Sequence, residues 1–429
     1  MWSGKYRFLI MILLFLAGTV NYLDRASIGI VAPMLSKDFA LSPSALGVVF
    51  SIFGFGYALF NFVGGMLADR YGPRRVYTWA AVSWSLFCGL TGVVTGFVQL
   101  LVVRTFFGFA EGPMNATSNR TITNWFPRRE TSRAVGVVWS GQAFGAVITP
   151  PIVGLLAIHY GWRFAFIAAG LIGLVWVIAW RIFATDYPNQ NPRVTQQENE
   201  YIESNRLVAE ISGSGDQDSI KRYLIHPCIL ALTLAMFAIN YGQYIFLTWL
   251  PSYLVDALHL EIRQMVFVAS IPWAGGFIGY FGGGFLSDYI YKKMSNKLNA
   301  RKITIIVPVG VAAVCLLLAL VMTTATGAVT LLAISVTMLT GSSQSCWATF
   351  REVVSERQLG GVSGYIHMLS NISMMVGPTI TGLAVQYLGG YSSAFIIVAC
   401  LSMVSIAVVW VFVRWPVPPV PTAQPVSAV

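Results

Sequence analysis

The sequence predicts an all-α membrane protein with twelve transmembrane helices in two bundles of six. Three observations lead to this fold class. Of the 429 residues, 56% are hydrophobic and 10% are charged, whereas a soluble domain carries about 25% charged residues. The apolar residues form stretches long enough to cross a bilayer core of roughly 30 Å. The basic residues gather in short loops between alternate stretches, which is the positive-inside pattern rather than a nucleic-acid-binding patch.

Each apolar stretch is interpreted as one span. The first continues through Asn21 to Leu35 without a small-residue cleavage site, so we interpret it as an uncleaved span and not as a signal peptide. An even number of spans puts both termini on one side, and the basic residues near both ends place that side in the cytoplasm. The expected spans are 8–35, 43–67, 75–95, 97–122, 132–158, 162–184, 227–256, 264–287, 302–323, 327–350, 358–386 and 391–414.

One long polar stretch divides the chain into six spans and six spans. Its charged part at 196–203 favours a short surface helix, and its Gly-Ser part at 212–216 is typical of a flexible linker. The predicted organisation is an N-terminal bundle at 1–184, a central cytoplasmic loop at 185–225, a C-terminal bundle at 226–415 and a disordered cytoplasmic tail at 416–429.

The two halves share a motif. Gly-Gly-Met-Leu-Ala-Asp-Arg at 64–70 ends the second span, and Gly-Gly-Phe-Leu-Ser-Asp-Tyr at 283–289 ends the eighth. Glycines allow two helices to approach closely, and an aspartate at a helix end can pair with basic residues across a gate. The repetition at equivalent places predicts parallel repeats whose interface holds the substrate. We assign gating to Gly65, Asp69, Arg70 and Asp288.

Four ionisable residues lie well inside spans, where such groups are costly and mark functional sites. They are Asp24 and Arg25 in the first span and Arg104 and Glu111 in the fourth. Arg104 and Glu111 share one helix face, about 10 Å apart, and we expect that face to look into a polar cavity. The arginines suit a substrate carboxylate, and the carboxylates can carry protons. The alternative is that Asp24–Arg104 and Arg25–Glu111 are permanent pairs that only fix helix packing.

The second half of the chain offers hydrogen-bonding groups in place of charge. Hydroxyl, amide and indole groups suit a polyhydroxylated ligand, and the candidates are Tyr244, Trp347, His367 and Asn371. For each of them the alternative is a role in helix packing. His367 is also a secondary candidate for proton coupling, because histidine titrates near neutrality.

Several motifs carry a family resemblance. Gly-Met-Leu-Ala-Asp-Arg-Tyr-Gly-Pro-Arg-Arg at 65–75 is similar to the loop signature of the major facilitator superfamily. Within it, the chain resembles the anion:cation symporter family of sugar-acid, sialic-acid and vesicular anion carriers. The segments that carry this second resemblance are Asn-Tyr-Leu-Asp-Arg at 21–25, Arg104 through Glu111-Gly112-Pro113, Asn-Trp-Phe-Pro at 124–127 and Phe-Leu-Thr-Trp-Leu-Pro at 246–251.

The resemblance covers essentially the whole chain and implies two bundles related by a pseudo-twofold axis. In that family, the positions matching Tyr57 and Gln142 line the site, and those matching the intramembrane charges act in carboxylate binding and proton coupling. Met114-Asn115-Ala116 departs from the family's apolar-proline pattern, which leaves the identity of the substrate open.

These patterns predict a transporter and not an enzyme, driven by the proton gradient without a cofactor. We expect proton-coupled uptake of a small organic anion, such as a sugar acid (hexonate, hexuronate or aldarate) or a sialic-acid-like monocarboxylate. A drug/proton efflux antiporter of the same superfamily is the alternative. The chain has no HExxH, GxSxG or P-loop, and its five cysteines form no CxxC, so no metal is expected. The expected setting is the bacterial inner membrane, as a monomer with no nucleic-acid partner.

The residues assigned to the site follow from both lines of reasoning. Proton coupling is assigned to Asp24 and Glu111. Substrate binding is assigned to Tyr22, Arg25, Tyr57, Arg104, Gln142, Tyr244, Trp347, His367 and Asn371.

Overall fold

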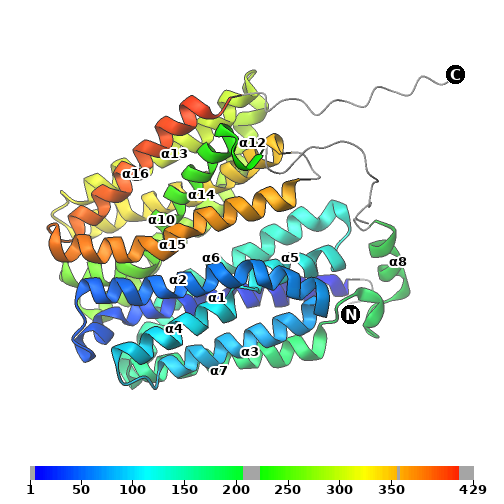
Figure 1. The fold of residues 1–429 in the computed structure, drawn as a ribbon, viewed down its shortest axis with the longest axis horizontal. Helices are drawn as coiled ribbons and strands as arrows, with labels where there is room; N and C mark the ends of the chain where they lie inside the picture. The colour runs from blue at the N-terminus through cyan, green and yellow to red at the C-terminus, as the bar shows by residue number, and fades with distance from the viewer. Residues whose placement is uncertain (1–4, 206–222, 355–357, 415–429) are drawn as a thin grey trace.

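Helices form nearly all of the computed structural model, which describes residues 5–205, 223–354 and 358–414 (Figure 1). The predicted linker at 212–216 and the predicted tail at 416–429 lie outside the described residues. In Figure 1 the helices of the first half fill the lower part of the view and those of the second half fill the upper part. The two halves meet along α1, α2 and α6 on one side and α10, α12 and α15 on the other.

The helices of the first half begin close to the N-terminus and follow one another with short connections. They are α1 (Tyr6–Asp38), α2 (Pro43–Tyr71), α3 (Pro73–Thr91), α4 (Phe97–Glu111), α5 (Met114–Trp125), α6 (Arg128–Tyr160) and α7 (Trp162–Phe183). A short 3₁₀ turn η1 (Pro188–Gln190) and the surface helix α8 (Gln196–Ser204) follow. Thr195 caps α8, because its hydroxyl accepts from the backbone N–H of Glu198.

The second half repeats this series of long helices. They are α10 (Pro227–Asp256), α11 (Ile262–Val268), α12 (Ser270–Lys293), α13 (Lys297–Ala319), α14 (Ala325–Val353), α15 (Leu359–Tyr387) and α16 (Tyr391–Phe412).

The predicted repeat is confirmed by which helices pack together. In the first half α1 packs on α6, α2 on α4, and α3 on α7. In the second half the matching pairs recur, because α10 packs on α15, α12 on α14, and α13 on α16. The contacts between the halves follow the same symmetry, with α2 against α15 and α12 against α6. Two copies of one helix arrangement therefore enclose the space between them.

The surface of the bundles is apolar, as a lipid-facing surface must be. Among the described residues, ten helices are long and apolar enough to cross a membrane. The two other predicted spans are α3, which begins with Arg74 and Arg75, and the fourth span, which is divided into α4 and α5. Large side chains such as Phe285 and Val175 are 79% and 67% exposed on the outside, which a water-facing surface would not tolerate in such number.

Helix ends differ from the prediction where local chemistry decides them. The fourth span is not continuous, because Gly112 and Pro113 separate α4 from α5 and proline cannot donate to the helical ladder. The repeated motif was expected to end its spans at 67 and 287, but α2 and α12 run on to Tyr71 and Lys293. Helix α2 ends at Gly72, which adopts a φ of 84°, a backbone conformation that favours glycine and does not continue an α-helix.

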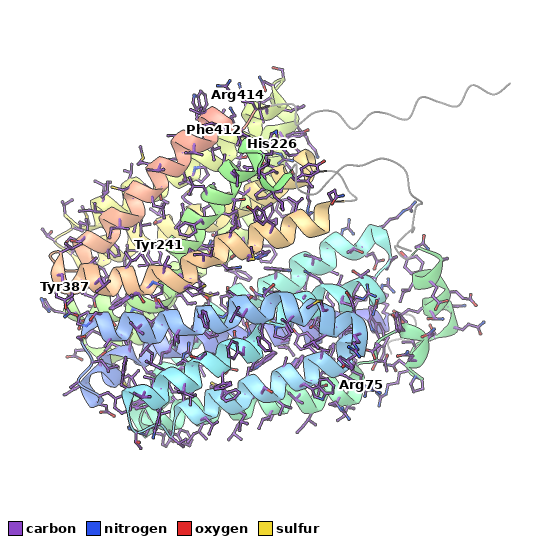
Figure 2. All side chains as sticks on the ribbon, viewed as in Figure 1. Arg75, His226, Tyr241, Tyr387, Phe412 and Arg414 are labelled. Atoms are coloured by element: carbon purple, nitrogen blue, oxygen red, sulfur yellow. The ribbon has the colours of Figure 1, made fainter. Side chains whose placement is uncertain are left out.

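Helix α8 is tied to the start of α1. The Glu198 carboxylate accepts from the backbone N–H groups of Tyr6 (2.8 Å) and Arg7 (3.1 Å), which have no partner inside α1. The Arg7 side chain bonds Glu198 (3.1 Å) and, at the start of α6, Glu130 (2.8 Å). An acidic group at a helix N-terminus is also favoured by the helix dipole. We call this end of the molecule the α8 end and the opposite end the far end; Arg75 lies toward the former and Tyr387 at the latter (Figure 2).

Candidate functional site

A cavity of about 560 Å³ lies between the two bundles. Most of its lining residues carry a polar group, and they come from α1, α2, α5 and α6 of the first half and α10, α12, α14 and α15 of the second. The lining residues are Tyr22, Arg25, Tyr57, Asn115, Asn119, Val135, Gly136, Trp139, Ser140, Gln142, Met236, Asn240, Gln243, Tyr244, Tyr280, Phe281, Ser343, Gln344, Trp347, Phe350, Arg351, Ser363, His367 and Asn371.

The cavity opens at the α8 end. Its lining extends to Arg351 near the end of α14 and to Ser363 near the start of α15. At the far end the bundles touch through their backbones. A Cβ atom on Gly47 of α2 would lie 2.6 Å from the carbonyl oxygen of Pro378 on α15, and Gly29 of α1 abuts Leu247 of α10 in the same way. The cavity is therefore open at one end and closed at the other.

Arg25 joins the cavity to a buried group of charges. It lines the cavity, and its Nη2 and Nε atoms lie 2.7 Å and 3.0 Å from Oε2 of Glu111. Glu111 is fully buried, and among the described residues its Oε1 atom has no hydrogen-bond partner. The guanidinium lies over the rings of Tyr57 (4.7 Å) and Tyr22 (5.1 Å), contacts that stabilise a cation. Arg25 thus has one side toward the cavity and another toward the Glu111 carboxylate.

Asp24 and Arg104 lie behind this pair. Asp24 is fully buried, and its Oδ1 atom accepts from the Cys88 thiol at 3.5 Å. Arg104 is 2% exposed, and its guanidinium lies over Phe53 (5.1 Å) and Phe107 (4.8 Å). Within the part of the chain that the structure describes, Oδ2 of Asp24 and the Nε and Nη1 atoms of Arg104 have no hydrogen-bond partner. Among the described ion pairs, Arg25–Glu111 is present and Asp24–Arg104 is not.

The position of Arg104 corrects one expectation. The face that Arg104 shares with Glu111 was expected to look into the cavity, but neither residue lines it. Aromatic rings cover Arg104, and Arg25 stands between Glu111 and the cavity. In this conformation Arg104 is a buried cation that does not line the cavity.

A hydrogen-bonded row crosses the first-half wall of the cavity. Asn115, on the first turn of α5, donates from Nδ2 to the Tyr57 hydroxyl at 2.8 Å. Its Oδ1 atom accepts from Nε2 of Gln142 at 3.1 Å. The prediction named Tyr57 and Gln142 but not Asn115, although the break of the family pattern at Met114-Asn115-Ala116 was a signal for it.

An aromatic corner forms where the two halves meet at the side of the cavity. The His367 ring lies 5.0 Å from the Trp347 ring and 6.1 Å from the Trp139 ring, measured between centroids. Asn371 holds His367, because its Nδ2 atom lies 3.1 Å from the ring Nδ1 and donates to the His367 carbonyl at 2.8 Å. Tyr244 lines the same cavity, and among the described residues its buried hydroxyl has no hydrogen-bond partner. Such a corner offers flat apolar faces with polar edges.

The predicted gating residues lie at the α8 end but pair within their own bundles. Asp69 contacts Arg120 of α5 at 3.4 Å, and Asp288 contacts Arg301 of α13 at 3.3 Å. Arg301 also bonds Glu352 at 2.6 Å. These pairs do not bridge the halves, which agrees with a cavity that is open at this end.

Of the two glycines in the first copy of the motif, Gly64 makes the close helix approach, and Gly65, which was assigned to gating, does not. A Cβ atom on Gly64 would collide with Pro113, whereas one on Gly65 would meet only Ala116 at 3.7 Å. Gly283, the equivalent of Gly64, packs in the same way on Gly341 of α14. Arg70 lies exposed beside the ring of Tyr71.

Within 5–205, 223–354 and 358–414, no three His, Cys, Asp or Glu side chains gather as metal ligands would. The chemistry that the cavity supports is recognition of an anion by Arg25, with hydrogen bonds around it.

The chain is similar to known membrane transporters over its whole length. It is 39% identical to the hexuronate transporter of Bacillus subtilis (strain 168), with 96% of each chain covered. It is 32% identical to the probable galactarate/D-glucarate transporter GudP of Escherichia coli (strain K12), over 93% of this chain and 92% of that one. A solved bacterial homologue of the human lysosomal transporter Spinster, inward-facing and occupied, has the same fold, with a TM-score of 0.78, 18% identity and coverage of 97% and 100%.

A family model supports the same assignment. The Major Facilitator Superfamily model matches residues 14–351 and 290–428. Together with the repeated bundles and the cavity between them, this match shows that the chain is a multi-pass membrane transporter, not an enzyme, and that it belongs to the Major Facilitator Superfamily.

Proposed function

We propose that this chain is a proton-coupled importer of a sugar acid with a single carboxylate, and that it prefers a hexuronate to other sugar acids. The observation that carries the proposal is the placement of Arg25, the one permanent cation in the deep part of the described lining. The other lining cation, Arg351, lies at the open mouth. One deep guanidinium suits one carboxylate, whereas the second carboxylate of an aldarate would be buried without a cation, which is costly.

The aromatic corner favours a substrate in ring form. A hexuronate closes into a pyranose with one carboxylate and several hydroxyl groups, and its apolar face matches the faces of Trp347 and His367. Hexonates and aldarates have no aldehyde with which to form a pyranose. Asn371 and the unpartnered Tyr244 hydroxyl lie within the same lining and can bond ring hydroxyls. The 39% identity to a hexuronate transporter, against 32% to a galactarate/D-glucarate transporter, supports the same choice.

The charges around Arg25 support coupling to protons. Arg25 and Arg104 balance Asp24 and Glu111, so the buried group is formally neutral. A substrate carboxylate that binds Arg25 competes with Glu111 for the same guanidinium. Glu111 then becomes a buried carboxylate that lacks its cation, and taking up a proton removes that cost. One proton with one monoanion restores neutrality, so we propose electroneutral symport at one to one.

The charge distribution supports an orientation. Arg70 lies in the last turn of α2 and Arg74 and Arg75 in the first turn of α3, and Lys292 and Lys293 end α12 at the equivalent place of the second half. By the positive-inside rule this end faces the cytoplasm of a bacterial inner membrane. The cavity as described is then open to the inside, in the state that releases substrate. The rival function, efflux of a cationic drug, is not favoured, because no aspartate or glutamate is among the described lining residues.

The test is binding of defined sugar acids to the purified protein, measured by thermal shift and calorimetry. D-Glucuronate or D-galacturonate at 100 times its Kd should stabilise the fold by about 2.7 kcal/mol. D-Glucose, which lacks the carboxylate, and D-glucarate, which has two, should bind at least tenfold more weakly. Stabilisation by D-glucarate but not by either hexuronate would overturn the choice of substrate, and equal binding of D-glucose would remove the role of Arg25.

A further inference from the structure

We propose that Asn115 fixes the direction of the hydrogen bonds between Tyr57 and Gln142, so that Tyr57 presents a donor to the anionic end of the substrate and Gln142 an acceptor to its hydroxyl groups. This makes Asn115 a specificity-determining positioning residue. The inference rests on the proposed transport of a hydroxylated monocarboxylate and adds a named selectivity element to it.

The geometry begins with the break in the fourth span. Pro113 ends the α4 helical ladder, and α5 starts at Met114, so Asn115 projects from the first turn of a new helix into the cavity. From there it reaches two other helices, Tyr57 on α2 at 2.8 Å and Gln142 on α6 at 3.1 Å. All three side chains line the cavity.

The direction of this row decides what the cavity offers. Asn115 has an amide donor at one side and a carbonyl acceptor at the other, and it gives the donor to Tyr57. The Tyr57 oxygen therefore accepts, and its single hydrogen is left for another acceptor. Gln142 gives its amide N–H to Asn115, which leaves the Gln142 carbonyl oxygen for another donor. If the side-chain amides of Asn115 and Gln142 were both flipped by 180°, Tyr57 would donate to Asn115. The Tyr57 hydroxyl would then offer a ligand only an acceptor, and Gln142 would offer only N–H donors.

The anion that Arg25 binds favours one of these two hydrogen-bond directions over the other. The Arg25 guanidinium lies 4.7 Å from the centre of the Tyr57 ring, and both side chains line the cavity, so an anionic group that binds Arg25 can reach the Tyr57 hydroxyl. A carboxylate accepts hydrogen bonds and cannot donate them. The observed direction therefore adds a second, neutral donor at the carboxylate, while the Gln142 oxygen accepts from a substrate hydroxyl. A carboxylate with hydroxyl groups on neighbouring carbons satisfies both ends.

The test is Asn115→Asp, measured as D-glucuronate affinity by calorimetry. Aspartate has the same shape but only acceptors, so both Tyr57 and Gln142 must donate to it and the donor at the substrate is lost. The affinity should fall about tenfold to a hundredfold, the range for a hydrogen bond to a charged group. Asn119→Asp is the matched control, because Asn119 lies one turn further along α5 and lines the same cavity.

A double-mutant cycle separates direction from charge and from folding. In a Tyr57→Phe background the donor is already absent, so Asn115→Asp should change the affinity less than about threefold, while the melting temperatures of all variants stay similar. An equal loss in Asn119→Asp and Asn115→Asp, or an undiminished loss in the Tyr57→Phe background, would overturn the inference and leave the proposed function intact. Failure of the wild-type protein to bind D-glucuronate would overturn both.

Discussion

The closed far end makes a prediction about the conformational equilibrium. Gly382, near the end of α15, faces the start of α2 across the boundary between the halves. A Cβ atom there would collide with the carbonyl oxygen of Pro43, and it would lie 3.1 Å from the Pro43 carbonyl carbon and 3.2 Å from Cα of Ser44. All three are backbone atoms, which cannot turn away as a side chain can. Gly382→Ala therefore disfavours the conformation in which α2 and α15 touch.

The size of the effect follows from the cost of overpacking, about 1–3 kcal/mol. A conformation that is open at the far end separates the backbones of α2 and α15, so only the closed conformation carries this cost. The population ratio of the open to the closed conformation therefore rises by about 5- to 150-fold. Gly→Ala also raises helix propensity by about 1 kcal/mol. Gly364→Ala on the same helix controls for this, since a Cβ atom at Gly364 would meet nothing within 4 Å.

The assay is the distance between spin labels at Thr95 and Thr326, two exposed residues at the far end of different bundles. The exposed Cys400 is first replaced by serine. In Gly382→Ala the population with a long distance should grow, whereas Gly364→Ala should match the parent protein. Identical distance distributions in the two variants would refute the reasoning that backbone contact at Gly382 holds the far end closed.

Three further predictions concern the charges. Glu111→Gln should abolish accumulation driven by a pH gradient in proteoliposomes, while exchange between two loaded compartments partly survives; accumulation at the wild-type level would move coupling to Asp24 or His367. Arg25→Lys keeps the charge but loses the second hydrogen bond of the guanidinium, so calorimetry should show at least a tenfold weaker affinity for D-glucuronate, and an unchanged affinity would remove Arg25 from the site. Asp69→Ala should slow transport but leave thermal stabilisation by D-glucuronate intact, because Asp69 is assigned to gating and not to binding. A folded Asp69→Ala variant that no longer binds D-glucuronate would contradict this assignment.

Much of the fold follows from the sequence because a bilayer imposes simple rules. Apolar length predicts where helices lie, and each of the twelve predicted spans coincides with a helix or with an interrupted one. The repeated glycine-aspartate motif predicts that the halves are equivalent, and the matching helix pairs confirm it. The division of the fourth span at Gly112 and Pro113 was missed, because a hydropathy window does not register a single broken turn.

The site was predicted less completely, since sequence spacing gives a helix face but not the neighbour that covers it. Helical periodicity places Arg104 and Glu111 on one face. It does not reveal that Phe53 and Phe107 cover the former. Asn115 was not assigned to the site, because its role depends on side chains from two other helices that only the folded chain brings within reach.

The contact between α8 and α1 has a consequence for how the two halves behave as separate pieces. The apolar spans of the first half end near Phe183, but Glu198, which accepts from the first N–H groups of α1, lies beyond that point. If the protein were produced as two co-expressed fragments, a cut just after Phe183 would strip α1 of its cap. A cut after Asn205 would leave the cap, α8 and the Arg7 ion pairs on one polypeptide. The unit that assembles as the first half therefore includes α8, and part of the polar stretch belongs to it as structure.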